Sequence, residues 1–180
     1  EIMRRAFTKL RSGRPGPVLL EIPQDVAGEE LDEVAFDYEP HPPLRTAGDR
    51  EAISQATRAL LAARRPIIQA GQGVLYAEAT EELVRLAEFL QAPVMTTLEG
   101  KSAFPENHPL SLGAGASSTT AGVHHFLSRA DLVLGIGCSF TKSSFSVPIP
   151  AGKVLVHATN DDGDINKDYR CQHPVVGDAK

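Results

Sequence analysis

The chain has 180 residues, of which 42% are hydrophobic and 23% charged, proportions typical of one globular domain rather than of a disordered or fibrous chain. Its formal charge of -5, without a continuous basic stripe, gives no reason to expect nucleic acid, and no apolar run approaches the roughly 18 residues that span a bilayer. Two cysteines are too few for a disulfide framework or a four-ligand zinc site, which favours a reducing, cytoplasmic setting.

The first part of the chain is predicted to contain a helix and a strand. Residues 1–11 place Ile2, Phe7 and Leu10 on one helical face. A turn of glycine and proline then leads into the apolar run 18–22, which Pro23 ends, as expected of a buried strand. So little chain precedes this strand that it has no sheet to join. We therefore expect residues 1–25 to be the end of a preceding domain, and the chain to be a fragment.

Residues 26–48 have the composition of an interdomain linker. Acids and prolines dominate, periodicity is weak, and the sequence 41–43 (His-Pro-Pro) cannot continue a helix. We expect a surface strap rather than a disordered tail, because the segment contains apolar side chains that it can bury, namely Leu31, Val34, Phe36 and Tyr38.

Residues 49–180 alternate between amphipathic helices and short apolar strands. Asp49 is the expected N-cap of the first helix. The expected order is a helix to about 64, a strand from 66, a helix over 77–91, the strand "VMTT", an irregular stretch 98–118, a helix over 119–128, the strand 131–137, the strand "KVLVHA", a short helix over 164–169 and "HPVVGDAK". This alternation predicts a doubly wound α/β domain, a parallel sheet with helices on both faces.

Glycines follow two of the predicted strands. Such a sheet binds ligands beyond the carboxyl ends of its strands, where the strand order reverses. Gly71 and Gly73 follow one strand, and Gly135 and Gly137 end another, so each pair could let the backbone approach a ligand. However, "GQG" lacks the third glycine of the dinucleotide fingerprint, and a turn without a ligand is favoured by about two to one.

Other polar residues form no convincing catalytic group. Asp161 and Asp162 could bind ribose hydroxyls, but aspartate equally caps helices. Lys101 follows a glycine without the rest of a phosphate-binding loop, which is weak support for a phosphate contact. The adjacent histidines 124–125 point in different directions on a helix, which argues against a shared metal. Cys138 is expected to be a buried, inert thiol, and no GxSxG elbow supports a hydrolase.

Several longer segments resemble a known family. These are "AGQGVLYAEATEELVRLAEFLQAPVMTTLEGKSAFPENHPLSLG" (70–113), "ADLVLGIGCSF" (130–140) and "VVGDAK" (175–180). In this order they are similar to the central domain of thiamine diphosphate-dependent enzymes of the acetolactate synthase type. The opening "GRPGPVLLEIPQDV" resembles the last strand of the pyrimidine-binding domain that precedes it in the family.

The resemblance implies a Rossmann-like central domain of about six parallel strands over residues 49–180, and it leaves open a truncation at the C-terminus of this domain. The parent would be a carboligase or decarboxylase of 2-oxo acids, a transferase or lyase, and a homodimer or homotetramer. Its thiamine diphosphate and Mg²⁺ would be held by the two other domains, because neither the activating glutamate nor the GDG motif with its asparagine pair is present here. The resemblance thus implies no catalytic or metal-binding residue in this chain, which should be inactive alone.

The resemblance also implies a place for FAD or ADP. The positions that match the flavin-contacting loops of the family are Gly71, Gln72, Gly73, Thr97, Leu98, Gly137 and Asp161. Three departures weaken a true FAD site: the "GARFDDR" loop reads "GCSFTKSS", a methionine-histidine-glycine segment reads "GASSTT", and the paired acids of "DID" become Thr159 and Asp161. We expect an altered nucleotide site instead. The alternative is a non-catalytic nucleotide-binding or oligomerisation module that keeps the fold without the chemistry.

Overall fold

A computed structural model describes residues 2–30, 39, 42 and 44–180. The chain divides into two compact units, residues 1–45 and residues 46–180, and each is considered by itself. Among the described residues, no helix combines the length and the apolar character needed to cross a bilayer.

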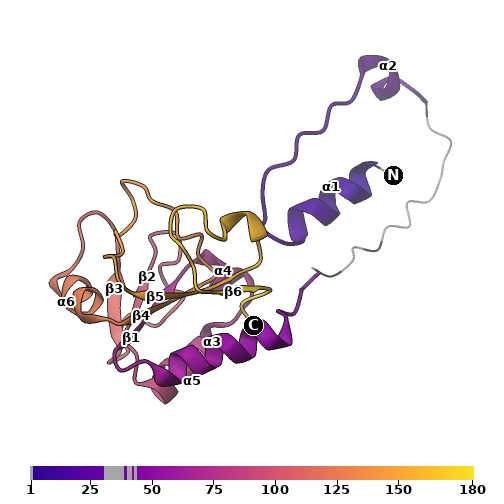
Figure 1. Cartoon of the computed structure of the whole chain (residues 1–180). Coiled ribbons are helices and arrows are strands. Elements are labelled where there is room, and N and C mark those ends of the chain that lie inside the picture. The colour runs from indigo at the N-terminus through magenta and orange to yellow at the C-terminus, as the bar shows by residue number, and fades with distance from the viewer. Residues whose placement is uncertain (1, 31–38, 40–41, 43) are drawn as a thin grey trace. The chain divides into compact units, whose positions relative to one another are not determined.

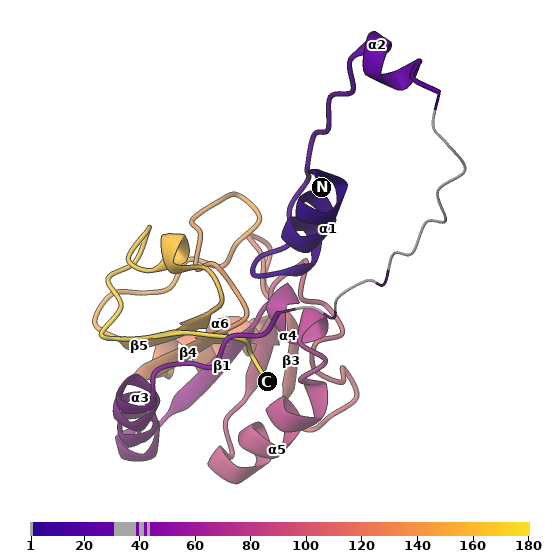
Figure 2. The same ribbon diagram turned by 90° about the vertical axis from the view of Figure 1, so that its right-hand side faces the viewer.

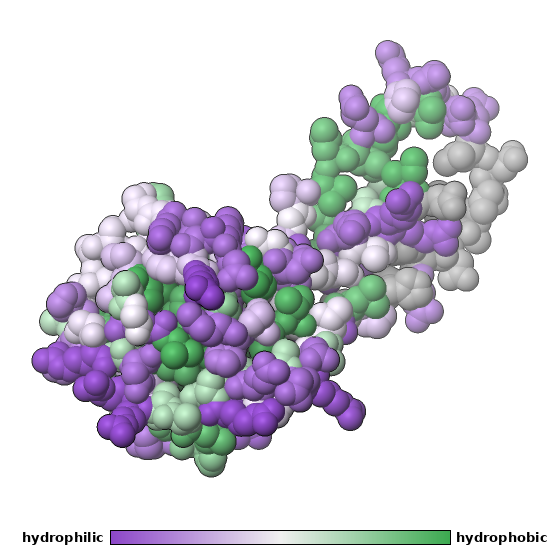
Figure 3. All heavy atoms as spheres, viewed as in Figure 1, coloured by the Kyte–Doolittle hydropathy of each residue, from purple (hydrophilic) through white to green (hydrophobic). Residues whose placement is uncertain are grey.

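The described residues of the first unit form two helices, α1 (Ile2–Arg11) and α2 (Gln24–Ala27). The predicted first helix is confirmed, but the strand expected over 18–22 is wrong: this segment is irregular. A strand requires a partner for its ladder of hydrogen bonds, and the described part of this unit contains no other strand. Leu19 is 90% exposed and Ile22 60% exposed, and hydrophobic residues gather along this segment (Figure 3). The apolar side chains expected to anchor the linker (Leu31, Val34, Phe36 and Tyr38) lie outside the described residues.

The second unit is built on a parallel sheet of six strands in the order β3-β2-β1-β4-β5-β6 (Figure 1). The strands are β1 (Pro66–Ala70), β2 (Val94–Thr96), β3 (Ser111–Ala114), β4 (Leu132–Ile136), β5 (Val154–Thr159) and β6 (His173–Val176). Successive strands are added outward from β1 in one direction and then outward from β4 in the other. The predicted doubly wound sheet of about six strands is confirmed, and its order reverses between β1 and β4.

Helices cover the two faces of this sheet unequally. One face carries α3 (Arg50–Ala62), α4 (Gln72–Tyr76) and α5 (Thr80–Leu90), and Figure 2 shows α3 and α5 on the same side. The other face carries α6 (Ala121–Arg129) and long loops. Asp49 caps α3 as predicted, since its side chain accepts a hydrogen bond from the Ala52 amide at 2.9 Å.

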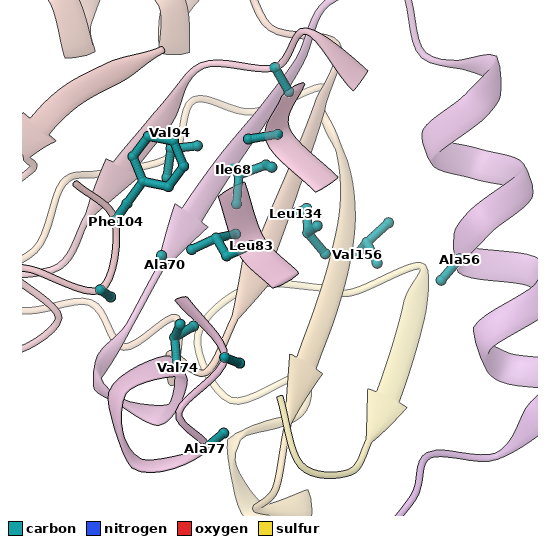
Figure 4. Packing of buried hydrophobic residues seen from close by; sticks show 14 of the residues in the cluster. Ala56, Ile68, Ala70, Val74, Ala77, Leu83, Val94, Phe104, Leu134 and Val156 are labelled. Atoms are coloured by element: carbon teal, nitrogen blue, oxygen red, sulfur yellow. The ribbon is translucent and has the colours of Figure 1, made fainter. Parts of the chain in front are cut away.

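Alternation along each strand divides the core between these faces. In β1, Ile68 points toward α3 and α5, where it packs with Leu83, Val94 and Phe104 (Figure 4). Its neighbour Ile67 points to the opposite side, into the cluster that includes the α6 side chains Val123 and Leu127. Both isoleucines are at most 1% exposed, so β1 is buried on both faces, as expected of a central parallel strand.

Three predicted elements differ from the structure because of local backbone conformation or weak patterning. The helix expected over 77–91 begins only at Thr80, because Glu78 has a φ of 55° and separates it from α4. The helix expected over 164–169 is a single 3₁₀ turn, η1 (Asp162–Asp164), followed by Asn166 at a φ of 59°. The irregular stretch 98–118 contains β3, a half-buried edge strand whose short sequence shows no clear alternation.

Candidate functional site

The loops that follow four strands meet at the carboxyl edge of the sheet. Backbone hydrogen bonds join them: Gly73 N donates to Gly137 O at 2.8 Å, and Thr97 N donates to Ala70 O at 2.9 Å. Gly137 N donates to the Ala158 carbonyl at the end of β5, also at 2.9 Å. The fold thus brings the predicted site residues after β1, β2, β4 and β5 to one edge, which we call the carboxyl crest.

The glycines of the crest are required by contacts between its loops. A Cβ on Gly71 would lie 2.2 Å from the Gly137 carbonyl oxygen, and one on Gly73 would lie 2.7 Å from Gly137 Cα. Gly137 itself has a φ of 60°, a left-handed conformation that favours glycine. A Cβ on Gly100, in the loop after β2, would lie 2.7 Å from Ala70 O. Close approach of backbone to backbone therefore explains these glycines without a ligand.

Among the non-glycine crest residues, Gln72 and Leu98 have exposed side chains, with Leu98 43% exposed. Thr97 instead holds its own loop together, because its Oγ1 accepts a hydrogen bond from Gly100 N at 2.9 Å. Of these three predicted residues, Gln72 and Leu98 are the ones whose side chains present a surface to a ligand.

Asp161 acts as a cap in the structure. Its Oδ1 accepts a hydrogen bond from Gly163 N at 3.0 Å, and its own amide donates to Thr159 Oγ1 at 3.2 Å. The capping interpretation of this residue is thereby confirmed, and a ribose contact stays a prediction. Asp162 lies on the surface within η1.

Gly135 serves the packing of an aromatic ring rather than the approach of a ligand. It lies near the C-terminal end of β4, and a Cβ there would be 2.2 Å from Cζ of Phe140. Phe140 is 5% exposed and folds back over the strand from which its loop emerges. The interpretation of Gly135 as a ligand-approach glycine is not needed, because the ring occupies that space.

His157 organises the same loop from the neighbouring strand β5. It is 1% exposed, and its Nε2 lies 2.8 Å from the Cys138 carbonyl oxygen, to which it donates a hydrogen bond. Its ring centroid lies 4.6 Å from that of Phe140. The sequence analysis did not single out this residue, and the signal for it was a histidine among the apolar residues 154–158. Together with Phe140, it fixes the loop after β4 at the crest.

We predict that His157 makes the fold less stable in mild acid. Burial lowers the pKa of His157 below its usual value of 6.5, although the Cys138 carbonyl and Asp164 oppose this shift. Below pH 6.5 the unfolded chain therefore binds a proton at His157 that the folded chain does not bind. The contribution of His157 to stability is complete above about pH 7 and decreases as the pH falls from 6.5 to the pKa of the folded state. One such proton changes the free energy of unfolding by at most about 1.4 kcal/mol per pH unit.

Urea unfolding between pH 7.5 and pH 5 measures this slope. The variant His157→Gln keeps a donor for the Cys138 carbonyl and should lose most of the slope, while His124→Gln, on the exposed side of α6, should retain it. An unchanged slope in His157→Gln would assign the effect to another group.

Cys138 is predicted to be inert toward thiol reagents. Burial raises the pKa of this thiol to about 12, and the residue is 7% exposed. Thiolate is the reactive form, so at pH 8 labelling by a disulfide reagent should be at least about 100-fold slower than for a free thiol. A Cys171→Ser variant isolates the signal of Cys138, which should appear only after denaturant is added. Rapid labelling of the native variant would contradict the buried placement.

The remaining sequence candidates do not join the crest chemistry. Lys101 is exposed, and its Nζ lies 3.7 Å from a carboxylate oxygen of Glu106. His124 and His125 are exposed on α6. In the part of the chain that the structure describes, no group of three or more His, Cys, Asp or Glu side chains could hold a metal ion.

The similarity of this chain to known proteins identifies its family. The family described as "Thiamine pyrophosphate enzyme, central domain" matches residues 53–180. The chain belongs to this family. It is 38% identical to a protein of Methanocaldococcus jannaschii assigned as an acetolactate synthase large subunit, over 100% of this chain and 32% of that protein. It is 36% identical to the acetolactate synthase large subunit of Corynebacterium glutamicum, over 100% of this chain and 29% of that protein.

Solved structures agree with this assignment to the thiamine pyrophosphate enzyme family. An enzyme of Mycobacterium smegmatis assigned as thiamin diphosphate-dependent superposes with a TM-score of 0.76 at 30% identity, over 99% of this chain and 34% of that one. Benzoylformate decarboxylase of Polynucleobacter necessarius gives a TM-score of 0.74 at 25% identity, again over 99% and 34%. The chain spans about a third of the length of the relatives that it matches.

The described residues do not fit thiamine diphosphate and its magnesium ion. The magnesium ion takes oxygen ligands such as carboxylates, and the described part of the chain has no group of three or more His, Cys, Asp or Glu side chains that could hold a metal ion. The buried aspartate of the second unit, Asp164, lies in η1 and forms an ion pair with Lys167 at 3.7 Å. The described residues therefore carry no catalytic step of their own that depends on this cofactor.

Proposed function

We propose that this chain is the central domain of a thiamine diphosphate-dependent enzyme that decarboxylates a 2-oxo acid or joins its acyl group to a second carbonyl compound. The observation that carries the proposal is the match of the whole chain to acetolactate synthase large subunits, at 36–38% identity. When bound, thiamine diphosphate would supply the carbanion chemistry from the other two domains of the parent. We expect the domain alone to be inactive, because the sequence contains neither the activating glutamate nor the GDG motif with its asparagine pair that the family resemblance leads us to expect in the other two domains.

We propose that the carboxyl crest makes this domain's own contribution, as an altered nucleotide site. Supporting this are its position where the strand order reverses and the exposed side chains of Gln72 and Leu98. The loop after β4 carries "GCSFTKSS", without the arginine and acids expected for flavin, and is fixed by Phe140 and His157. We therefore favour ADP over FAD as the ligand of the carboxyl crest, with Asp161 in contact with the ribose of the nucleotide.

The enzyme proposal is tested on the full-length protein. Decarboxylation of pyruvate should require added thiamine diphosphate and Mg²⁺, and size-exclusion chromatography with light scattering should give a homodimer or homotetramer. If no 2-oxo acid is consumed and thiamine diphosphate does not bind, the chain is instead a non-catalytic module. We also propose a cytoplasmic location, because both thiols, Cys138 and Cys171, are free.

The nucleotide proposal is tested separately by equilibrium dialysis of the full-length protein with ADP and with FAD. Leu98→Asp places a carboxylate at the crest and should weaken ADP binding by roughly tenfold or more, since like charge repels the diphosphate. Leu61→Asp is the matched control, because Leu61 is 60% exposed on α3. Equal loss in both variants, or tighter binding of FAD than of ADP, would contradict the proposed site.

A further inference from the structure

The face of the sheet that carries α6 is covered over β5 by loops instead of a helix. The connection from β4 to β5 (137–153) and that from β5 to β6 (160–172) contain no α-helix, and the second has only η1. Figure 1 shows these orange and yellow loops on the side of the sheet opposite α3 and α5. Crossovers between parallel strands usually carry a helix, which seals the sheet face beneath it. Here the loops take over that role.

A cavity of about 770 Å³ lies between the two loops. Its apolar lining includes Leu155 of β5 and Ile149 of the first loop, which are 4% and 9% exposed. Two exposed prolines of the first loop, Pro148 and Pro150, extend this lining. The volume falls within the range of about 300–1,000 Å³ that is usual for sites of small molecules.

Hydrogen bonds between the loops give the cavity defined walls. Lys142 N donates to Asp168 Oδ2 at 2.8 Å, and Ile149 N donates to the hydroxyl oxygen of Tyr169 at 3.2 Å. The Tyr169 hydroxyl keeps its own proton for a further acceptor. These bonds cross from one loop to the other, so the cavity walls are held together without a ligand.

Positive charge exceeds negative charge around the cavity. Its lining carries Lys142, Lys153 and Arg170 against one carboxylate, that of Asp168. Lys153 Nζ is occupied by the carbonyls that end α6, at 2.7 Å from Ala130 O. Lys142 Nζ stands 4.5 Å from the Tyr169 ring centroid.

Lys142 and Arg170 are the cations of the lining that are available to a ligand. Within the described part of the chain, neither Lys142 nor Arg170 has an acidic side chain at ion-pair distance. In a chain of formal charge -5, this local excess favours an anion next to an apolar floor.

We propose that this cavity binds a small organic anion, with its carboxylate or phosphate group toward Lys142 and Arg170 and its apolar body against Ile149 and Leu155. Tyr169 would donate a hydrogen bond to the anion from its hydroxyl. The cavity shares the loops after β4 and β5 with the carboxyl crest, but none of the seven predicted nucleotide-contacting residues lines it.

Phenyl phosphate is the probe, since it combines an aromatic body with a phosphate. Titration of the ¹⁵N-labelled 180-residue chain to about 10 mM should give saturable amide shifts within 142–153 and 168–172. The double variant Lys142→Gln/Arg170→Gln should weaken binding roughly tenfold, whereas Lys101→Gln should leave it unchanged. Equal melting temperatures of the variants confirm that the fold is kept, as expected for exposed side chains.

The other outcomes overturn the proposal. Without saturable shifts, or with equal affinity in the double variant, the cavity has no anion site. If inorganic phosphate binds as tightly as phenyl phosphate, the apolar residues do not contribute to binding. If phenol binds as tightly as phenyl phosphate, the cations do not contribute. Shifts confined to the loops at 71–73 and 97–100 would assign the probe to the carboxyl crest instead, a result that leaves the proposed function intact.

Discussion

Replacement of Gly71 by alanine is expected to destabilise the second unit by about 3 kcal/mol, near the upper end of the usual range for an overpacked core site. The added Cβ would lie 2.2 Å from the Gly137 carbonyl oxygen and 2.6 Å from Cys138 Cα. Both are backbone atoms of another loop, so no side-chain rotation relieves the clash. The loss should appear as a fall in melting temperature of roughly 10 °C, and as a lower urea midpoint at an unchanged m-value.

Gly122→Ala is the matched control for this substitution. Gly122 lies in α6, and the nearest atom to an added Cβ there is 3.7 Å away, an ordinary contact. Alanine in a helix restricts the unfolded chain, so this variant should be more stable by about 0.5–1 kcal/mol. If Gly71→Ala were as stable as the native chain, the loops of the carboxyl crest would have to lie further apart than the structure places them.

Gly135 and Phe140 are expected to show strong coupling in a double-mutant cycle. Gly135→Ala should cost about 2–3 kcal/mol, because its Cβ would lie 2.2 Å from Cζ of the Phe140 ring and the buried ring must move. Phe140→Ala should cost about 3–4 kcal/mol as a large-to-small change in the core. In the double variant the clash is absent, so the total cost should be at least about 1 kcal/mol below the sum.

The control cycle combines Phe140→Ala with Gly48→Ala. A Cβ on Gly48 would meet Val175 at 2.8 Å, and Val175 packs with the cluster on the other face of the sheet. These two changes share no partner and should add within about 0.5 kcal/mol. Additivity in both cycles would show that the Phe140 ring does not pack over Gly135, and that the loop after β4 follows another path.

Local patterns were sufficient to predict most elements of the second unit. Buried parallel strands such as β1 and β4 appear as short apolar runs, and amphipathic helices such as α3 appear as a 3.6-residue period that begins at a capping aspartate. The doubly wound class follows from their alternation, and the ordered motifs predicted the family. Local conformation was predicted less well: Glu78 and Asn166 adopt positive φ values that composition does not reveal. The edge strand β3 lacks the apolar run that marks a buried strand.

Contacts between distant segments required the tertiary structure. The sequence by itself determined the order of helices and strands, and with it the edge where the loops after β1, β2, β4 and β5 must meet. It did not show that Gly71 and Gly73 are needed to admit the backbone of Gly137, because that contact joins residues more than sixty positions apart. The placement of Phe140 over Gly135, the bond from His157 to Cys138 and the cavity above Leu155 likewise depend on how loops pack on a finished sheet. Periodicity reports which face of an element is buried, and only the folded chain decides which atoms bury it.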